Sequence, residues 1–485
     1  MNSEKSFSPT LIVVLLITLG VHVQSLFNDF HTDDWQILMI MERGFAWRSF
    51  LSMENLANFR PFANMVIILR SALFDRLPYL WYALNILLHL CATLLLYIFV
   101  KSRLNTAAAI VSALVFAVYF QHFEAVLWLY GIVRLIAAIM LILTLIYYFR
   151  FRQSGHYGDL VKSFLFYFLA LLTVEETVIF AMFLGGGLIL SRQSDSPKTR
   201  YYGAGYIVLV LAYLILRFLA VGYGNTAAEY FYPGWHILKN FYGYCTWIVM
   251  PQLNHPYLAA FATKYLPFVS GFAGVFNVVA FGVFAIASIF FLIKGNASER
   301  AMLAFLLLSL IMPSMLDSKV STKLLYIPSL ASAALAGSVF YRLWQLLQER
   351  GRRLLIALMI VYLLAQAAAL NVTIAYYRTT QQHVQHIVDE IAQLDVNWAE
   401  YDYLLLDNLP GRVQPGHALK YRLKFNVRLV QKNQATENLL SLERVEQDLR
   451  ASGVGFILID FISGKAIIRE QIERLQGSFP EGRQG

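Results

Sequence analysis

The residues best suited to chemistry are two adjacent carboxylates, Asp33 and Asp34, in the segment Phe30–Trp35 just after the first apolar stretch. Paired carboxylates beside a membrane can act as a general base or bind a divalent cation. The same pair also suits a helix start, because aspartates ahead of an apolar run cap the helix and complement its dipole. The pair alone leaves both interpretations open.

Glutamates at two further positions also stand beside apolar runs. Glu124 follows His122 at the end of one such run, and Glu175 and Glu176 interrupt another with no Lys or Arg nearby in the sequence. A carboxylate close to hydrocarbon is costly and is therefore a functional candidate. The adjacent pair needs water, a proton or a cation from a distant part of the chain. The alternative for each site is an ordinary polar turn in water.

A set of basic side chains lies within or near the apolar segments: Arg60, Arg70, Arg134, Arg217, Lys319 and Lys323. The planar guanidinium of arginine donates two parallel hydrogen bonds to a phosphate, so these residues are candidates for binding a lipid-linked phosphate. The alternative is that each one extends its charged end to the lipid headgroups.

The composition indicates a membrane protein. Only 14% of the 485 residues are charged and 58% are hydrophobic, whereas soluble domains carry about 25% charged residues. The net charge of +9 does not require a nucleic-acid partner, because Lys and Arg in short loops are the usual membrane-orientation signal. The two cysteines do not suggest a disulfide framework, and no nucleotide-binding loop or zinc-protease motif is present.

About eleven segments have the apolar length of a membrane span. They lie near residues 9–26, 80–100, 106–121, 125–149, 163–174, 177–190, 202–222, 271–293, 301–316, 323–342 and 354–376. The first segment is interpreted as an anchor because no small-residue cleavage site follows it. The sequence therefore predicts an all-α polytopic membrane domain over residues 1–377.

The basic residues predict the orientation. With the N-terminus in the cytoplasm, nearly all loop cations fall inside, and only Lys319 and Lys323 go against the positive-inside rule. The inside cations are Lys101, Arg103, Arg150, Arg152, Lys162, Arg192, Lys198, Arg200, Lys294, Arg300, Arg342, Arg350, Arg352 and Arg353. We therefore expect an inner-membrane protein whose loops 27–79 and 223–270, and whose tail, lie outside.

The tail, residues 378–485, has the pattern of a small soluble α/β domain. A polar helical stretch, 380–396, precedes short apolar runs bounded by turn residues, and a charged helical pattern spans 437–451. At about 100 residues it is long enough to bury a modest core.

The order of several motifs resembles the GT-C membrane glycosyltransferases, in particular the O-mannosyltransferase branch with transmembrane and tetratricopeptide-repeat regions. The matching residues are Asp33-Asp34, Phe59-Arg60-Pro61-Phe62, Asn85 with His89, the segment Val115–Val126, Glu176-Thr177, and Lys323 to Ser329 with Tyr326 and Pro328. The family's turn has proline where this chain has Phe120 or Gln121, and the lysine before its Glu-Thr step is Glu175 here. The tetratricopeptide repeats are absent.

The resemblance implies an inverting transfer, at an outer-face site, from a polyprenyl-phosphate-linked sugar to an acceptor hydroxyl on protein, lipid or glycan. It implies catalytic roles for Asp33, Asp34, Glu124 and Glu176. Donor-phosphate contacts are expected from Arg60, Arg217, Lys319, Lys323 and Tyr326. A divalent cation, held by Asp33 and Asp34 if present, is left open.

Two rival functions remain at this stage. A transporter or flippase for a lipid-linked saccharide predicts inverted repeats and unwound helices near mid-membrane, and no internal symmetry is evident in the sequence. A non-catalytic scaffold would use its outside tail to recruit partners. Only the enzyme consumes the donor.

Overall fold

The computed structural model describes residues 9–30, 34–42, 50–51, 59–189, 197–222, 233–251, 256–267, 271–316, 321–397, 400–401, 403–407, 428–431, 450, 456–462 and 465–472. The chain divides into two compact units. Unit 1 comprises residues 1–27 and 44–375, and unit 2 comprises residues 28–43 and 376–485. Each unit is described by itself below.

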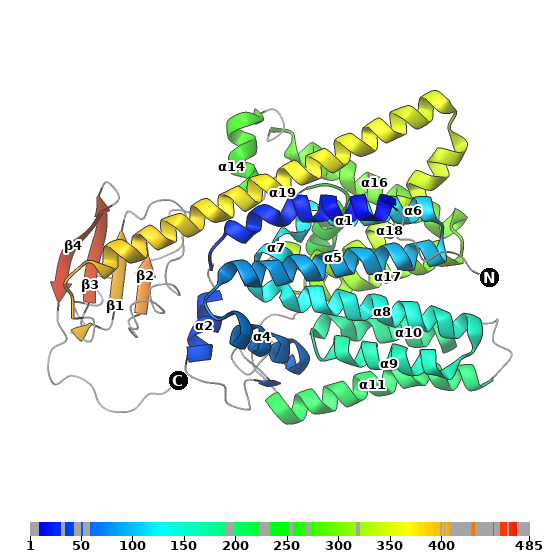
Figure 1. Ribbon diagram of the computed structural model, residues 1–485, viewed down its shortest axis with the longest axis horizontal. Helices are drawn as coiled ribbons and strands as arrows, with labels where there is room; N and C mark the ends of the chain where they lie inside the picture. Colours follow the sequence, from blue (N-terminus) through cyan, green and yellow to red (C-terminus); the bar gives the residue numbers. More distant parts are fainter. Residues whose placement is uncertain are drawn as a thin grey trace. The chain divides into compact units, whose positions relative to one another are not determined.

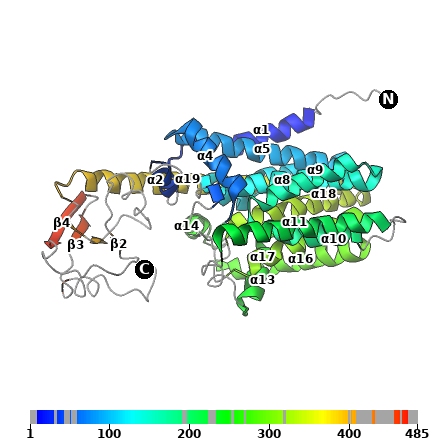
Figure 2. The same ribbon diagram turned by 90° about the horizontal axis from the view of Figure 1, so that it is seen from below.

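Unit 1 is a bundle of long apolar helices, most of which run side by side (Figures 1 and 2). Eight helices among the described residues are long and apolar enough to cross a membrane. They are α1 (Pro9–His22) with η1 (Val23–Phe27), α5 (Pro78–Arg103), η3 (Leu129–Gly131) with α8 (Ile132–Ser154), α11 (Pro197–Val221), α16 (Ala273–Lys294), α17 (Ala297–Ser314), η5 (Thr322–Leu325) with α18 (Tyr326–Leu346), and α19 (Glu349–Ala392).

A ninth candidate span is broken. Helix α6 (Thr106–Val118) meets the pair η2 (Phe120–His122) and α7 (Phe123–Leu127) at an angle of 53°. The expected spans at 163–174 and 177–190 correspond to α9 (Tyr157–Leu171) and α10 (Phe180–Ile189). These helices have 15 and 10 residues, which is shorter than the roughly 20 residues that a straight crossing needs. The sequence predicted about eleven spans, whereas the described residues contain eight, or nine with the broken one. The shortest predicted segments account for the difference.

Three shorter helices that the structure describes in unit 1 fall in the two loops expected outside. Helix α4 (Pro61–Phe74) lies in the first of these loops, residues 27–79, and it begins at a proline, which suits the first turn. Helices α13 (His236–Val249) and α14 (Pro256–Tyr265) lie in the second loop. The backbone N–H of Phe62 donates to the carbonyl of Leu172, which fixes the start of α4 against the end of α9.

The centre of unit 1 is closely packed around α5, α6, α8 and α18. At Gly337 of α18, an added Cβ would collide with the backbone carbonyl of Ala108 and with the hydroxyl of Ser112, both on α6. Small residues at such a contact let two membrane helices approach closely. This contact places α18, and η5 at its start, against the broken span.

Unit 2 contains a four-stranded sheet in the order β2-β1-β3-β4, with the tail end of α19 and α2 (Asp34–Glu42). Strands β1 (Tyr403–Asp407), β2 (Arg428–Gln431) and β3 (Phe456–Ile462) are parallel, and β4 (Lys465–Ile472) is antiparallel to β3. The apolar runs of β1 and β3 are buried, as expected for inner parallel strands. The α/β tail is confirmed, whereas the helix expected at 437–451 lies outside the described residues apart from Arg450.

Candidate active site

The two adjacent glutamates of unit 1 each receive a cation from a distant part of the chain. They begin η4 (Glu175–Ile179), between α9 and α10. The Nε atom of Arg60 lies 3.0 Å from Oε2 of Glu175, and Nη2 of Arg134 lies 2.8 Å from Oε1 of Glu176. The four side chains are 6–25% exposed. The sequence left water, a proton or a distant cation as possible ways to stabilise the two carboxylates. In the structure, each carboxylate is paired with a distant arginine.

Glu175 keeps one oxygen without a described partner. Its Oε1 is buried and accepts no hydrogen bond among the residues that the structure describes. Such an atom is rare in a folded protein unless a water, an ion or a ligand reaches it. The sequence indicated that Glu175 and Glu176 both need a counterion, but it assigned a catalytic role to Glu176 alone. The carboxylate at position 175, where the resembled family carries lysine, was the available signal.

Glu124 joins two separate segments at the same end of the bundle. Its Oε2 accepts hydrogen bonds from the backbone N–H of Lys323 and from the hydroxyl of Ser321, both at 2.8 Å. The ammonium of Lys323 lies 4.0 Å from the ring centre of Trp128, a cation–π geometry. Ser321 was missed from the sequence, where its position two residues before Lys323 was the only signal.

Two aromatic rings connect these groups. The hydroxyl of Tyr130 accepts from Nη1 of Arg60 at 3.3 Å, and its ring lies 5.4 Å from that of Trp128. We call the resulting set the charged cluster; it consists of Arg60, Glu124, Trp128, Tyr130, Arg134, Glu175, Glu176 and Lys323. Its three carboxylates and three cations balance in formal charge. The cluster therefore has both the acids and the cations that a proton transfer next to a phosphate requires.

Polar residues of α5 hold the broken span that carries Glu124. The side-chain amide of Asn85 donates to the carbonyls of Val126 and Trp128, at 3.1 and 3.3 Å. The Nε2 atom of His89 lies 3.3 Å from the carbonyl of Ala117. A helix broken inside a membrane needs such partners for its freed backbone groups. The Asn-x-x-x-His step recognised in the sequence thus acts on the backbone.

The other side of the break is held from α18 and α19. Gln366 accepts from the backbone N–H of Phe120 at 3.0 Å. Nε2 of His122 lies 2.7 Å from the hydroxyl of Ser329, and Nδ1 of His89 lies 2.7 Å from that of Tyr326. Tyr326 was expected at the donor phosphate. The structure places it fully buried, next to His89.

The remaining candidate cations have different surroundings. Arg217, on α11, interacts electrostatically with Tyr213. Tyr213 also interacts electrostatically with Arg60 and Glu175. Arg70 is buried, donates to the carbonyl of Leu129 at 3.0 Å, and stacks 4.1 Å over the ring of Trp81. Arg217 therefore lies beside the charged cluster, whereas Arg70 is part of the packed interior.

The aspartate pair belongs to the other unit. Asp34 is the first residue of α2 and is 1% exposed, which agrees with a helix start. Its segment is held within unit 2, where the backbone of Asp29 exchanges two hydrogen bonds with the side chain of Gln381. Asp33 and Lys319 lie outside the described residues. The expected convergence of the aspartates with Glu124 and Glu176 stays a prediction.

The described residues contain no group of three or more His, Cys, Asp or Glu side chains arranged for a metal ion. Because only Asp34 of the aspartate pair is described, a cation at that pair also stays a prediction.

A large apolar cavity lies between α6, α13 and α16 to α19. Its volume is about 330 Å³, and its walls include Val115, Tyr119, Ile248, Phe284, Ser329 and Tyr362. Ser329 lines this cavity, and its hydroxyl contacts Nε2 of His122, two residues before Glu124. The cavity thus reaches the base of the segment that carries Glu124, and its lining suits a hydrocarbon chain.

Comparisons with known proteins give matches at the level of structure. No protein-family model matches the sequence. No curated protein matches it.

Two solved structures share the fold over most of this chain. The apo oligosaccharyltransferase of Archaeoglobus fulgidus superposes with a TM-score of 0.53 at 13% identity, covering 93% of this chain and 69% of its own. ArnT from Cupriavidus metallidurans, solved with undecaprenyl phosphate, gives a TM-score of 0.53 at 12% identity, covering 93% of each chain. A second form of the archaeal enzyme, AglB with an inhibitory peptide and a dolichol-phosphate, gives 0.51 at 12% identity. At this level of identity the similarity establishes the fold.

Proposed function

We propose that this chain, which has the fold of the GT-C membrane glycosyltransferases, transfers a sugar from a polyprenyl-phosphate donor to an acceptor hydroxyl. The observation that carries the proposal is the charged cluster. Five separate segments bring three carboxylates and three cations together at one end of a membrane bundle. Charged groups held partly buried next to a membrane are costly and indicate function.

The reaction needs a base and a site for a leaving phosphate. A carboxylate takes the proton of the acceptor hydroxyl as its oxygen bonds to the sugar C1. The C1–O bond to phosphate breaks, and the polyprenyl phosphate leaves with the bonding electrons. Attack from the face opposite the phosphate inverts C1. We assign the base to Asp33 or Asp34, with Glu124 and Glu176 as further catalytic carboxylates; phosphate contacts are assigned to Arg60, Arg217, Lys319 and Lys323.

We also assign Glu175 to the substrate-binding site, because its Oε1 atom has no hydrogen-bond partner among the described residues. One oxygen is paired with Arg60, and the other is buried and available. A hydroxyl of the sugar or of the acceptor would satisfy it. Tyr326 is reassigned from phosphate contact to positioning, because its hydroxyl already contacts His89 inside the packed core.

The donor class is supported by the apolar cavity and by the neighbours. ArnT was solved with undecaprenyl phosphate, and AglB with a dolichol-phosphate. In this chain the cavity of about 330 Å³ offers apolar walls for part of such a tail. The motif resemblance favours mannose as the sugar, and the acceptor is a protein, lipid or glycan hydroxyl.

The orientation is supported by the distribution of charge. Lys101 and Arg103 end α5, Arg152 is in the last turn of α8, and Arg342 lies near the end of α18. All four lie at the end of unit 1 opposite the charged cluster, because α5, α8 and α18 each begin near the cluster and run away from it. The positive-inside rule then favours the outer face of the cytoplasmic membrane for the charged cluster. The outside location of the tail, residues 378–485, is proposed from the sequence pattern alone.

A donor-consumption assay tests the proposal. Purified protein is incubated with undecaprenyl-phosphate monosaccharides, including the mannose form, and with a membrane extract that supplies protein, lipid and glycan hydroxyls as acceptors, and release of undecaprenyl phosphate is measured. We expect release to be lost in Asp33→Asn and Asp34→Asn with folding intact. The matched control is Asp75→Asn, an exposed aspartate of the same loop at a positive φ that asparagine also tolerates. Full activity of both aspartate variants overturns the assignment.

The broken span is the one observation that favours a transporter, because transporters use interrupted helices at their substrate sites. Its freed groups at Ala117, Phe120 and Val126, however, are satisfied by protein side chains. A flippase would move the donor across vesicles without releasing undecaprenyl phosphate, so the same assay separates the two functions.

A further inference from the structure

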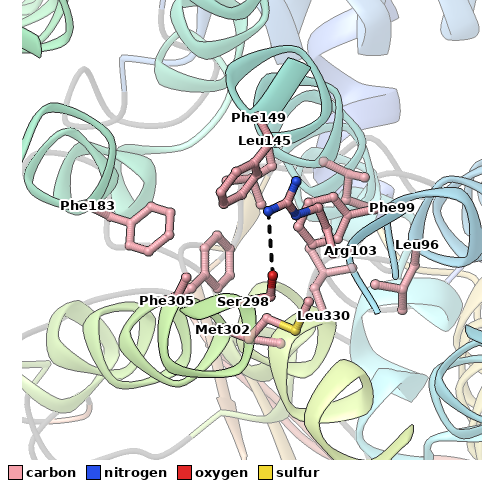
Figure 3. Close-up of a pocket in the computed structure, with 13 residues that line it drawn as sticks. Leu96, Phe99, Arg103, Leu145, Phe149, Phe183, Ser298, Met302, Phe305 and Leu330 are labelled. Carbon is pink, nitrogen blue, oxygen red and sulfur yellow. Dashed lines mark hydrogen bonds between the residues drawn. The ribbon is translucent and has the colours of Figure 1, made fainter. Parts of the chain in front are cut away.

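A second cavity lies at the end of unit 1 opposite the charged cluster. It has a volume of about 30 Å³ and is enclosed by α5, α8, α10, α17 and α18. Its walls are aromatic and aliphatic side chains, among them Phe99, Phe183 and Phe305 (Figure 3). The polar residues in its lining are Arg103 and Ser298.

The guanidinium of Arg103 is directed into the cavity. Its Cζ lies 4.3 Å from the ring centre of Phe149, and Nη2 lies 3.5 Å from the hydroxyl of Ser298. Figure 3 shows the side chain between these two residues. An arginine that ends a span usually extends outward to the headgroups. The inward direction of Arg103 is therefore a departure that needs a reason.

No residue that the structure describes forms an ion pair with Arg103. Its Nε is buried without a hydrogen-bond partner among the same residues. Arg152 lies near enough to repel it electrostatically. By contrast, Arg342 at this end is neutralised by Glu299, and Arg353 pairs with Glu349. A half-buried cation without a counterion is a site for an anion.

We propose that Arg103 and Ser298 bind the phosphate of an anionic phospholipid at this end of the bundle, while the small cavity holds the guanidinium in place. Arg103 is the last residue of a 26-residue span, so it lies at the depth of the lipid phosphates. Basic pockets between membrane helices on the cytoplasmic side suit anionic headgroups. The bidentate fork of arginine suits the phosphate.

Native mass spectrometry of the purified protein, titrated with phosphatidylglycerol or phosphatidylcholine, tests this site. We expect a phosphatidylglycerol adduct on the wild type that weakens about tenfold in Arg103→Gln, since a charge-assisted hydrogen bond is lost. Arg103→Lys should recover part of the affinity. The matched control is Arg353→Gln, which removes the same charge from an exposed pair at the same end and should bind like the wild type.

A further arm identifies the source of the phosphate. Competition by millimolar inorganic phosphate would assign the site to a free anion and overturn the lipid proposal. Thermal unfolding of each variant reports folding. Equal phosphatidylglycerol binding by folded Arg103→Gln and Arg353→Gln rejects the site.

Discussion

At the scale of single residues, the main finding is that two of the cations proposed for phosphate binding, Arg60 and Lys323, already have partners in the charged cluster. Arg60 is bound to Glu175 and to Tyr130, and Lys323 stacks on Trp128. A guanidinium has five N–H donors, so pairing with one carboxylate does not exclude a phosphate. Whether Arg60 has one role or two is a question that paired mutations answer.

A double-mutant cycle separates the two roles of Arg60. Arg60→Gln leaves Glu175 without its cation and should cost about 1–3 kcal/mol of stability, less than for a fully buried pair because both side chains are partly exposed. Adding Glu175→Gln should restore most of this stability. If Arg60 also binds the donor phosphate, donor release in the double variant stays below that of Glu175→Gln alone. Recovered stability with donor release equal to that of Glu175→Gln alone would make Arg60 purely structural.

The pairing partners show what sequence reasoning reaches at this scale. The sequence indicates that Glu175 and Glu176 need a distant cation, because an unpaired carboxylate beside hydrocarbon is too costly. It does not identify Arg60, 115 residues away, or Arg134, 42 residues away. Those pairings depend on how the spans pack, which local periodicity does not encode. The orphan oxygen of Glu175 likewise appears only in three dimensions.

At the scale of elements, the broken span depends on its polar supports. Asn85→Ala leaves the carbonyls of Val126 and Trp128 without their side-chain donor in a buried setting, and should cost about 1–3 kcal/mol. The control is Thr93→Ala on the same helix, whose hydroxyl donates only to the carbonyl one turn before. Thermal unfolding in detergent measures both. Equal, small effects would mean that the break is held by packing alone.

Close approach of α6 and α18 sets the position of η5 and therefore of Lys323. Gly337→Ala should destabilise unit 1 by about 1–3 kcal/mol, because the new Cβ meets Ala108 and Ser112. The matched control is Gly274→Ala on α16, where an added Cβ meets nothing within 4 Å. That variant should be neutral or slightly stabilising, since alanine favours a helix. The reverse order of stabilities would contradict the packing.

The sequence predicted the membrane-spanning helices correctly where an apolar segment is long enough to cross the bilayer. The spans predicted at 80–100 and 271–293 match α5 and α16 to within a few residues. The short segments at 163–174 and 177–190 form helices too short for the span criterion, because apolar length alone does not separate a short tilted span from a helix packed within the bundle. The strands of the tail were predictable because their apolar runs are bounded by turn residues.

At the scale of the whole molecule, the charge pattern carries the functional argument. The charged cluster and the basic end lie at opposite ends of unit 1, so a single orientation in the membrane decides which leaflet each one meets. An outer-face enzyme requires the cluster outside. Arg103 then meets the cytoplasmic leaflet, where anionic lipids attract basic residues.

Cysteine accessibility tests that orientation. In a background with Cys91 and Cys245 replaced, Ser102→Cys places an exposed thiol at the end of α5, and Thr263→Cys places one on α14 in the loop after α11. A membrane-impermeant maleimide should label the α14 site in right-side-out spheroplasts and the α5 site only in inside-out vesicles, because the short basic loops are retained in the cytoplasm. The opposite labelling would place Glu124, Glu175 and Glu176 in the cytoplasm. A transferase acting at the outer face would then have no accessible cluster, whereas Arg103 would face the outer leaflet.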